Sequence, residues 1–321
     1  MINWKTCALV AAVVTAAGLT CAGSPHNNIP SDFRNAITDN SKISTTTTGL
    51  EKDKGNIAVS TATAVDGVSK SHIAGKNDSP TGAPSTPIEW IAINGGKFMM
   101  GTDTVDKGFE DAKQIHEVAI KTFDMSKTLV TVEQYAECVI QNKCTAPDTG
   151  HYGFCNWGVA GRQLHPVNCV DWDQANQYAK FKHGRLPSES EWEYAARSGG
   201  KNQKYPWGDE AATCDKAVMY GKDATGCDNN STMPVCSKTA GNTAQGLCDM
   251  AGNVWQWVQD KYQNSYTGAP ADGGAFEGAG TLRVLRGDSF LSSAPEHLRA
   301  DNRHSAHPDR RAVGFGFRLA K

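Results

Sequence analysis

Eight cysteines between residues 138 and 248 constrain the fold of this 321-residue chain more than any other feature. Beyond Gly199 the sequence is rich in Gly, Asn, Asp and Cys, so much of it must be loop. Each disulfide between neighbouring cysteines would contribute about 2–4 kcal/mol through loop entropy. Many connectivities are open, and the absence of a C-x2-C spacing disfavours zinc ligation. We expect sequential neighbours to pair among Cys138, Cys144, Cys155, Cys169, Cys214, Cys227, Cys236 and Cys248.

The N-terminus predicts export. Lys5 precedes an apolar stretch, Ala8 to Leu19, which is too short to cross a bilayer but typical of a signal peptide. We therefore interpret residues 1–21 as a signal peptide rather than a buried helix, in agreement with the oxidising compartment that disulfides require. Gly18 stands where a bacterial lipoprotein box usually has Leu before its cysteine, here Cys21. Two localisations stay open: a bacterial lipoprotein anchored to the membrane through Cys21, or a periplasmic or secreted chain.

A compositional change at Pro87 separates a linker from the globular part of the chain. Residues 22–86 are dominated by Ser, Thr, Gly, Asn, Lys and Asp, and have too little apolar area to offset the entropy lost on ordering. We predict a disordered linker there. Residues 87–321 are long enough for one or two domains. The net charge of −2 and the lack of Lys or Arg runs predict no nucleic-acid partner.

Local patterns predict strands first and then helices. Residues 88–93 alternate as a strand does, and Asn94-Gly95-Gly96 is a turn signal that leads into residues 97–101, so we expect an opening hairpin. Residues 118–123 form a third strand candidate. Helices are expected from Thr131, over residues 171–183, and over residues 188–197, where Ser188 and Glu191 form a capping box.

Five motifs carry a family resemblance. They are Gly184–Arg197 (GRLPSESEWEYAAR), Tyr205–Gly208 (YPWG), Gly246–Trp257 (GLCDMAGNVWQW), Arg286–Phe290 (RGDSF) and Gly314–Arg318 (GFGFR). In this order they resemble the formylglycine-generating enzyme family, whose domain is also called the sulfatase-modifying factor domain. The resemblance covers residues 87–321. It implies a single, loop-rich α+β domain related to the C-type-lectin fold.

The resemblance also predicts that the family's reaction is lost. Active members oxidise a substrate cysteine to formylglycine with oxygen and copper(I), which two cysteines shortly after an Arg-Gly-Gly-Ser motif hold. Copper(I) prefers thiolate ligands. Here the two places fall on Ser292 and His297, and no cysteine follows Cys248. We therefore expect no copper and no catalytic residue in this chain.

Calcium is the one cofactor that the resemblance implies. The family's better-matching calcium site uses Asn, two backbone carbonyls and Glu. The corresponding positions here are Asp249, Gly252, Val254 and Gln256. Calcium binds oxygen ligands, with an affinity that rises with the number of carboxylates. Compared with the family's Asn and Glu, Asp249 adds one carboxylate and Gln256 removes one, so the number of carboxylates is unchanged.

The C-terminal segment, residues 288–313, is the candidate contact face for a protein or carbohydrate ligand, because Arg and His make directional contacts without a reaction. The candidate residues are Ser289, Phe290, Ser292, His297, Arg299, Arg303, His304, His307 and Arg310. Two alternatives stay open: an oxidoreductase or other enzyme in which the histidines hold a different metal, and a maturation factor of a secreted product. The segment also resembles those that diversity-generating retroelements vary in related lectin-like proteins.

Overall fold

The computed structural model describes residues 85–104, 106–147, 149 and 153–321. The predicted signal peptide, the lipidation candidate Cys21 and residues 22–84 of the predicted linker lie outside the described residues. Ser85 and Thr86 hydrogen bond to glutamates of helix α2 (Val132–Ile140), at 2.9 and 3.1 Å. These two residues therefore belong to the folded domain rather than to the linker. Within the described part of the chain, no helix is long and apolar enough to span a membrane.

The first four strands form a bent two-stranded ribbon. β1 (Trp90–Ile93) pairs antiparallel with β4 (Phe123–Ser126), and β2 (Gly96–Met100) pairs antiparallel with β3 (His116–Ile120). The expected hairpin between residues 88–93 and 97–101 is therefore wrong, because Asn94 and Gly95 bend one long strand instead of reversing it. Glycine is required at this bend, since a Cβ on Gly95 would lie 2.3 Å from the carbonyl oxygen of Ile120. The strand predicted at 118–123 spans the end of β3 and the start of β4.

All three predicted helices are present, and each begins with a capping box. They are α2, α3 (Trp172–Phe181) and α4 (Glu189–Ala196), with N-caps Thr131, Asp171 and Ser188. In each box the cap side chain accepts an N–H three residues further on, and that residue's side chain accepts the backbone N–H of the cap. Short 3-10 helices η1 (Glu110–Ala112), η2 (Thr239–Gly241) and η3 (Pro295–Leu298) lie in the loops.

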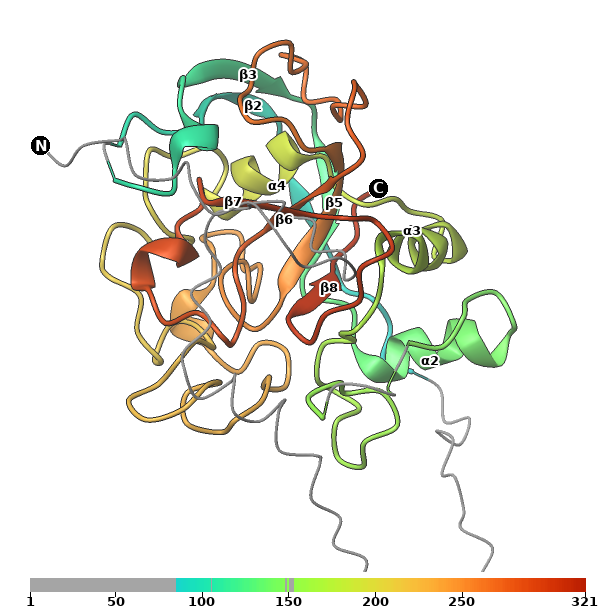
Figure 1. Cartoon of the computed structure of the whole chain (residues 1–321). Helices are drawn as coiled ribbons and strands as arrows, with labels where there is room; N and C mark the ends of the chain where they lie inside the picture. The colour runs from blue at the N-terminus through green and yellow to red at the C-terminus, as the bar shows by residue number, and fades with distance from the viewer. Residues whose placement is uncertain (1–84, 105, 148, 150–152) are drawn as a thin grey trace, which may run out of the picture. The chain divides into compact units, whose positions relative to one another are not determined.

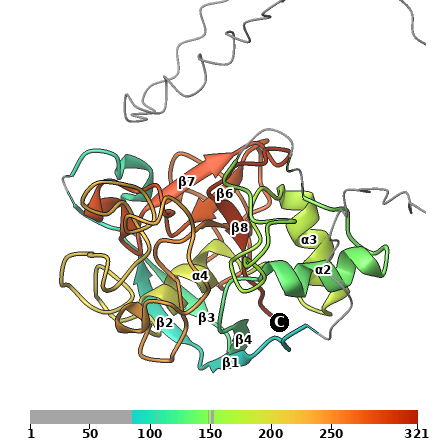
Figure 2. The same cartoon turned by 90° about the horizontal axis from the view of Figure 1, so that it is seen from below.

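A four-stranded sheet forms the centre of the domain (Figure 1). Its order is β7 (Arg303–Ala306), β6 (Arg283–Arg286), β5 (Trp255–Lys261) and β8 (Phe315–Phe317); only the β5–β8 pair is parallel. Alternate residues of β5 point to opposite sides. Trp257 packs into the hydrophobic cluster of α2 and α3, which lie side by side in Figures 1 and 2, and Val258 packs into the cluster of α4. The predicted α+β fold class is confirmed.

Four disulfides fasten the loops between the helices and the sheet. They join Cys138 to Cys144, Cys155 to Cys169, Cys214 to Cys227, and Cys236 to Cys248. The prediction that sequential neighbours pair is confirmed. Their Cα separations of 5.0–5.7 Å lie in the range that disulfides favour. The covalent links hold segments that contain little regular secondary structure.

Candidate functional site

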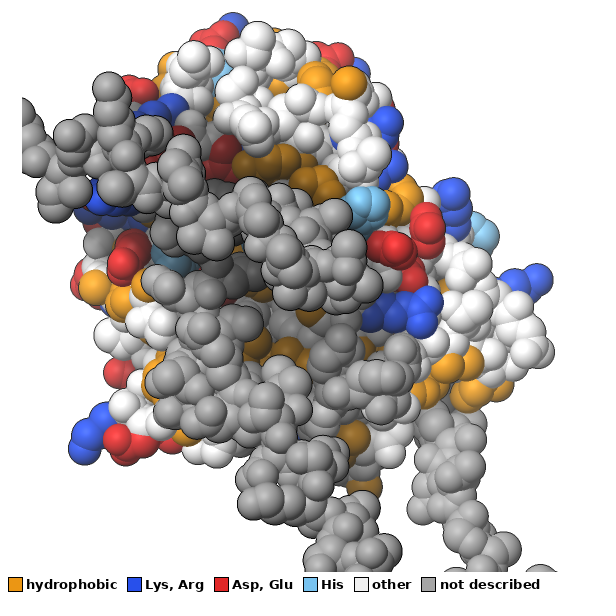
Figure 3. All heavy atoms as spheres, viewed as in Figure 1, with side chains coloured by type: hydrophobic (Ala, Val, Ile, Leu, Met, Phe, Trp, Pro, Cys, Tyr) orange, Lys and Arg blue, Asp and Glu red, His pale blue; other side chains and the backbone are white. Residues whose placement is uncertain are grey.

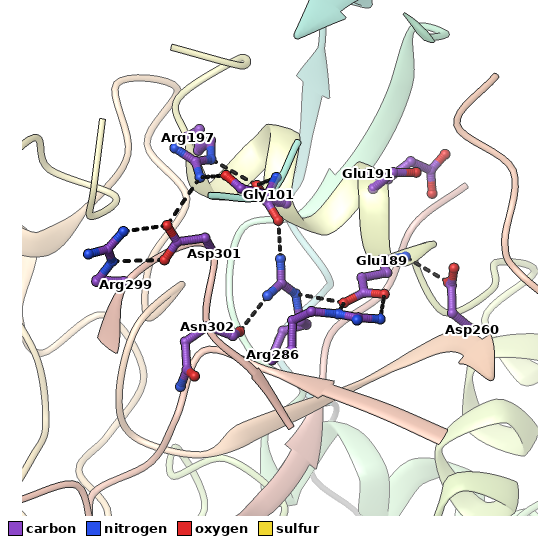
Figure 4. A network of polar contacts seen from close by, with 12 residues as sticks. Gly101, Glu189, Glu191, Arg197, Asp260, Arg286, Arg299, Asp301 and Asn302 are labelled. Carbon is purple, nitrogen blue, oxygen red and sulfur yellow. Dashed lines mark hydrogen bonds and ion pairs between the residues drawn. The ribbon is translucent and has the colours of Figure 1, made fainter. Parts of the chain in front are cut away.

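A buried network of ion pairs joins α4 to the C-terminal strands (Figure 4). Glu189 and Glu193 lie one helical turn apart on α4 and are both buried. Arg286 of β6 pairs with Glu193 and lies 3.4 Å from Glu189. Arg303 of β7 donates two hydrogen bonds to Glu189, at 2.6 and 2.8 Å. Because these charges are buried, removing one member of an ion pair would leave the other charge uncompensated in the interior and destabilise the fold.

The network continues to the C-terminal end of α4. Arg197 donates to Glu193 at 2.9 Å and lies 3.6 Å from Asp301, which accepts two hydrogen bonds from Arg299 at 2.6 and 2.9 Å. Arg299 and Arg303 are therefore buried and paired inside the domain. This corrects the expectation that they lie on an exposed contact face: their guanidiniums are already occupied by carboxylates.

The loop that follows β6 is also buried, which corrects a second part of the expected face. Ser289, Phe290 and Ser292 are all enclosed. Backbone N–H groups of residues 220 and 226, in the loop that the Cys214–Cys227 disulfide closes, donate to the carbonyl oxygens of Ser292 and Phe290 at 2.8 and 2.9 Å. The loop is thus anchored from outside by a second loop.

Asp288 is the most unusual residue of this loop. Its φ of 55° lies in the left-handed region that favours glycine. Its carboxylate accepts the backbone N–H of Ser289 at 2.7 Å. Burial raises the pKa of Asp288 to about 7, although the nearby Ser292 hydroxyl and the Ser289 backbone N–H act in the opposite direction. The site therefore holds a carboxyl group that gains or loses its proton near neutral pH.

Four of the predicted contact residues do lie at the surface: His297, His304, His307 and Arg310. The imidazole of His304 lies 5.1 Å from the half-buried ring of Trp255, measured between ring centres. His307 is 3.7 Å from Asp309. Among the residues that the structure describes, no three or more His, Cys, Asp or Glu side chains gather where they could hold a metal ion. His297, His304 and His307 are exposed side chains of the C-terminal segment.

One of the four residues that the resemblance assigns to calcium, Gln256, already uses its side-chain oxygen in hydrogen bonds. Gln256 Oε1 accepts Trp192 Nε1 at 2.8 Å and Arg318 Nε at 2.6 Å, which uses both of its lone pairs. Gln256 and Arg318 also donate to the carbonyl oxygen of Asp249, at 2.9 and 3.2 Å, so a guanidinium already lies beside it. Calcium takes about six to eight oxygen ligands. Gly252 and Val254 would contribute backbone carbonyls, as in the family's site, so the mismatch lies at Gln256.

No free thiol is present among the residues that the structure describes, because all eight of their cysteines are in disulfides. Ser292 Oγ donates to the carbonyl oxygen of Ala294 at 3.2 Å, and His297 is exposed. Neither Cys236 nor Cys248 can supply sulfur near Ser292 in this state, since these two cysteines are bonded to each other. The loop offers a hydroxyl, an imidazole and a buried carboxyl group, and no soft metal ligand.

Sequence analysis missed the role of the α4 glutamates. The capping box identified the helix, but nothing in that local pattern distinguishes a glutamate that faces the core from one that faces solvent. A signal was present: Glu189 and Glu193 are spaced by four residues and flank Trp192, so they share a helix face near a large apolar ring. The arginines that neutralise them lie 93 and 114 residues away.

The fold and site together define a disulfide-stabilised, loop-rich α+β domain whose motif residues meet in a buried arginine–carboxylate core. A family model described as the sulfatase-modifying factor enzyme 1-like domain matches residues 76–321. The chain belongs to this family. The match includes all five sequence motifs and the whole of the described sheet.

Both active and inactive relatives are similar to this chain. It is 30% identical to the formylglycine-generating enzyme of Streptomyces coelicolor over 290 residues, which cover 75% of this chain and 91% of that protein. It is 28% identical to the inactive C-alpha-formylglycine-generating enzyme 2 of Bos taurus over 279 residues, 73% of this chain and 88% of that one. The family therefore contains members with and without the reaction.

Solved structures with the same fold include PvdO from Pseudomonas aeruginosa. That structure is 30% identical, has a TM-score of 0.62, and covers 73% of this chain and 94% of its own. The Treponema denticola variable protein 1 has a TM-score of 0.57 at 22% identity, covering 74% of this chain and 96% of its own. The second likeness concerns the fold alone.

Proposed function

We propose that this protein is an exported, non-catalytic member of the family that binds a protein or carbohydrate ligand through its C-terminal surface. The observation that carries the proposal is the absence of a free thiol in the described residues, where all eight cysteines are paired. In this proposal Ser292 and His297 occupy the places of the two cysteines that hold copper in active members. The similarity to an inactive relative in Bos taurus supports it.

The chemistry of the proposed site argues against the oxidation reaction. Copper(I) requires soft ligands such as thiolates, and a neutral hydroxyl with one imidazole does not replace a thiolate pair. Ser292 is buried and bonded to a backbone carbonyl, and His297 points to the surface. The two side chains therefore lack both the sulfur and the shared enclosure that such a metal needs.

The proposed contact surface is smaller than the sequence suggested. It consists of His297, His304, His307 and Arg310, with the ring of Trp255 beside His304. Imidazole and guanidinium groups donate directional hydrogen bonds, and a partly exposed indole ring adds apolar area, a combination that suits sugars and polar peptide surfaces. On the part of the face that is visible in Figure 3, basic and acidic side chains are interspersed, which supports the expectation of no nucleic-acid partner.

Export belongs to the same proposal. Four disulfides are typical of an oxidising compartment outside the cytosol, and the sequence of residues 1–21 is typical of a signal peptide. A lipid on Cys21 would tether the domain to a bacterial membrane, and mass spectrometry of the mature N-terminus tests this. Calcium forms no part of the proposal, because the side-chain oxygen of Gln256 is already hydrogen bonded to Trp192 and Arg318.

An activity assay tests the non-catalytic role. Purified protein, supplied with copper and a reductant, is incubated with a Cys-x-Pro-x-Arg peptide, and aldehyde formation is followed by mass spectrometry. The formylglycine-generating enzyme of Streptomyces coelicolor serves as the positive control. We expect no aldehyde from this protein, and measurable turnover would overturn the proposal.

A binding assay tests the proposed surface. An array of defined glycans is probed with the wild-type protein, with a His297→Ala, His304→Ala, Arg310→Ala triple variant, and with Lys97→Ala as a control in β2, outside the proposed surface. We expect the triple variant alone to lose binding. Retained glycan binding by a folded triple variant would contradict this surface.

A further inference from the structure

The Cys214–Cys227 disulfide is more accessible than the other three disulfides of the described chain. Both of its cysteines are partly exposed. Each of the other three contains a cysteine that is at most 1% exposed: Cys138, Cys169 or Cys248. The rate of thiol–disulfide exchange depends on the access of a thiolate to the bonded sulfurs. Cys214–Cys227 is therefore the described disulfide most open to exchange.

The disulfide closes a loop whose outer part, residues 220–230, has an unusual backbone; we call this part the flap. Cys227, Asp228 and Asn230 have φ angles of 54°, 69° and 54°, in the left-handed region that is unfavourable for residues with a Cβ. The carboxylate of Asp228 accepts the backbone N–H of Asp223 at 2.9 Å and that of the next residue at 2.8 Å. Such a conformation persists only where the surrounding structure enforces it.

Few contacts fix the flap to the rest of the domain. Its backbone N–H groups at Tyr220 and Gly226 donate to the carbonyl oxygens of Ser292 and Phe290, at 2.8 and 2.9 Å. The other backbone N–H bonds described for the flap stay within it or return to Met219. The disulfide ties the flap back to the base of the loop, and without it these few hydrogen bonds would have to hold a strained segment.

The loop that the disulfide closes also shares a small hydrophobic cluster with η3. The buried members of this cluster are Tyr205, Ala212, Ala217, Met219, Ala251 and Leu298, and the two cysteines pack against them. Leu298 is the last residue of η3 and follows the exposed His297. Because Cys214 and Cys227 take part in the packing, opening their bond would loosen this cluster together with the flap's two hydrogen bonds.

We propose that Cys214–Cys227 is a thiol–disulfide exchange site, and that its reduction by a dithiol releases residues 288–298 from the flap. A thiolate of the dithiol attacks one sulfur and forms a mixed disulfide with it, while the other sulfur leaves as a thiolate and takes a proton from water. The second thiol of the dithiol then attacks the reagent's sulfur in the mixed disulfide and frees the second cysteine. Two electrons and two protons pass from the dithiol to the protein, and an oxidised dithiol reverses the steps.

The effect of reduction should be local. Residues 214–227 contribute to neither of the two large hydrophobic clusters that pack against the central sheet. The other three disulfides stay closed, so the helices and the sheet remain folded while residues 288–298 become mobile. The inference concerns the mobility of this segment and does not rest on the binding of a ligand to it.

Differential labelling of the full chain tests the exchange site. Thiols that are free in the native protein are first blocked with N-ethylmaleimide. A low concentration of dithiothreitol is then added, and the thiols that appear are trapped with iodoacetamide and assigned by peptide mass spectrometry. We expect Cys214 and Cys227 to be labelled about tenfold faster than the cysteines of the other three disulfides, because access limits exchange at buried bonds. Labelling at the same rate or more slowly would overturn the exchange site.

Hydrogen exchange tests the release of the segment. Peptides that cover residues 288–298 are compared between oxidised protein, protein reduced only at Cys214–Cys227, and a Cys214→Ser, Cys227→Ser variant. We expect the protection of these peptides to fall by roughly tenfold in the last two samples, as local opening requires, while peptides that cover β2 do not change.

Cys138→Ser, Cys144→Ser is the matched control, because it removes a disulfide at α2 and should leave the protection of residues 288–298 as in wild type. The proposal is overturned if this protection is the same in oxidised and reduced protein, or if the control lowers it as much as the loss of Cys214–Cys227 does. Should the Cys214→Ser, Cys227→Ser variant fail to fold, the selectively reduced wild-type protein decides alone.

Discussion

The buried network on α4 and the C-terminal surface both contain arginine, yet the arginine side chains do opposite things in the two regions. Arg286 and Arg303 are enclosed and paired with Glu193 and Glu189. Arg310, only seven residues after Arg303, is exposed. The difference lies in the partner: α4 supplies carboxylates to Arg286 and Arg303, whereas no carboxylate among the described residues pairs with Arg310. The presence of arginine therefore does not distinguish the two regions. A buried, paired arginine stabilises the fold, and an exposed arginine remains available to a ligand.

Breaking the buried side of this comparison should have the largest effect. Arg286→Ala removes one of the two guanidiniums that pair with the buried Glu193 and leaves its Oε2 without that partner, and we expect the free energy of unfolding to fall by about 3–5 kcal/mol. Urea denaturation at pH 7 measures this. Arg310→Ala is the matched control on the exposed side and should change stability by no more than about 0.5 kcal/mol. Equal effects of the two changes would remove the distinction between the regions.

Loss of one disulfide should rank second. Cys155 and Cys169 are both buried and close a loop with a sequence separation of 14 residues, so the double change to Ala should cost roughly 2–4 kcal/mol. Differential scanning calorimetry gives the shift of the melting temperature. An unchanged melting temperature would mean that the network alone holds these loops in place.

Asp288 lies at the border between the two regions and should show a pH-dependent effect. Its folded pKa, about 7, is above the ordinary aspartate value, so its contribution to stability is present at low pH and is lost as the pH rises to about 7. Asp288→Asn removes this loss, and we expect the variant to exceed wild type by up to about 4 kcal/mol at pH 8 and by much less at pH 4.5. Urea denaturation at the two pH values measures the difference. A gain that is equal at both would show that the carboxyl group is not the cause.

Calcium should have the smallest effect of all. Because Gln256 and the carbonyl of Asp249 are bonded to Trp192 and Arg318, millimolar calcium or its chelation should shift the melting temperature by less than about 1 °C. Calorimetry with and without EGTA measures this. A clear stabilisation by calcium would show that Arg318 can be displaced from Asp249, and would restore the expectation based on the family resemblance.

Local signals predicted much of the fold correctly. An N-cap at Thr131 predicted α2, helical spacing predicted α3, and a capping box at Ser188 predicted α4, because each of these signals lies within a short stretch of sequence. Sequential disulfide pairing was also predictable, since short separations leave neighbouring cysteines close together. The hairpin prediction failed at Asn94-Gly95-Gly96, where the same residues suit a reversal or a bend. The choice depends on pairing with β3 and β4, more than twenty residues later.

The candidate site was harder to predict for the same reason. Arg299 and Arg303 were expected at the surface because Arg is usually exposed, and only their three-dimensional neighbours show otherwise. Glu189 lies 114 residues before Arg303. Gln256 kept its place in a motif, but its lone pairs are used by side chains 62 and 64 residues away. Membership of a motif therefore indicated which residues lie close together in the fold. It did not indicate whether a side chain is exposed, paired with a charge, or already hydrogen bonded.

The last residues of the sequence have a consequence for how the domain is made. β8 pairs with β5 in the middle of the motif region, Arg318 bonds to backbone carbonyls of residues 126 and 248, and Ala320 bridges to both Met125 and Arg185. A polypeptide still emerging from the ribosome or from a membrane pore lacks these contacts, so the four-stranded sheet cannot be completed before residues 315–317 arrive. Folding of this domain should therefore follow passage of the whole chain, which suits transport in an unfolded state.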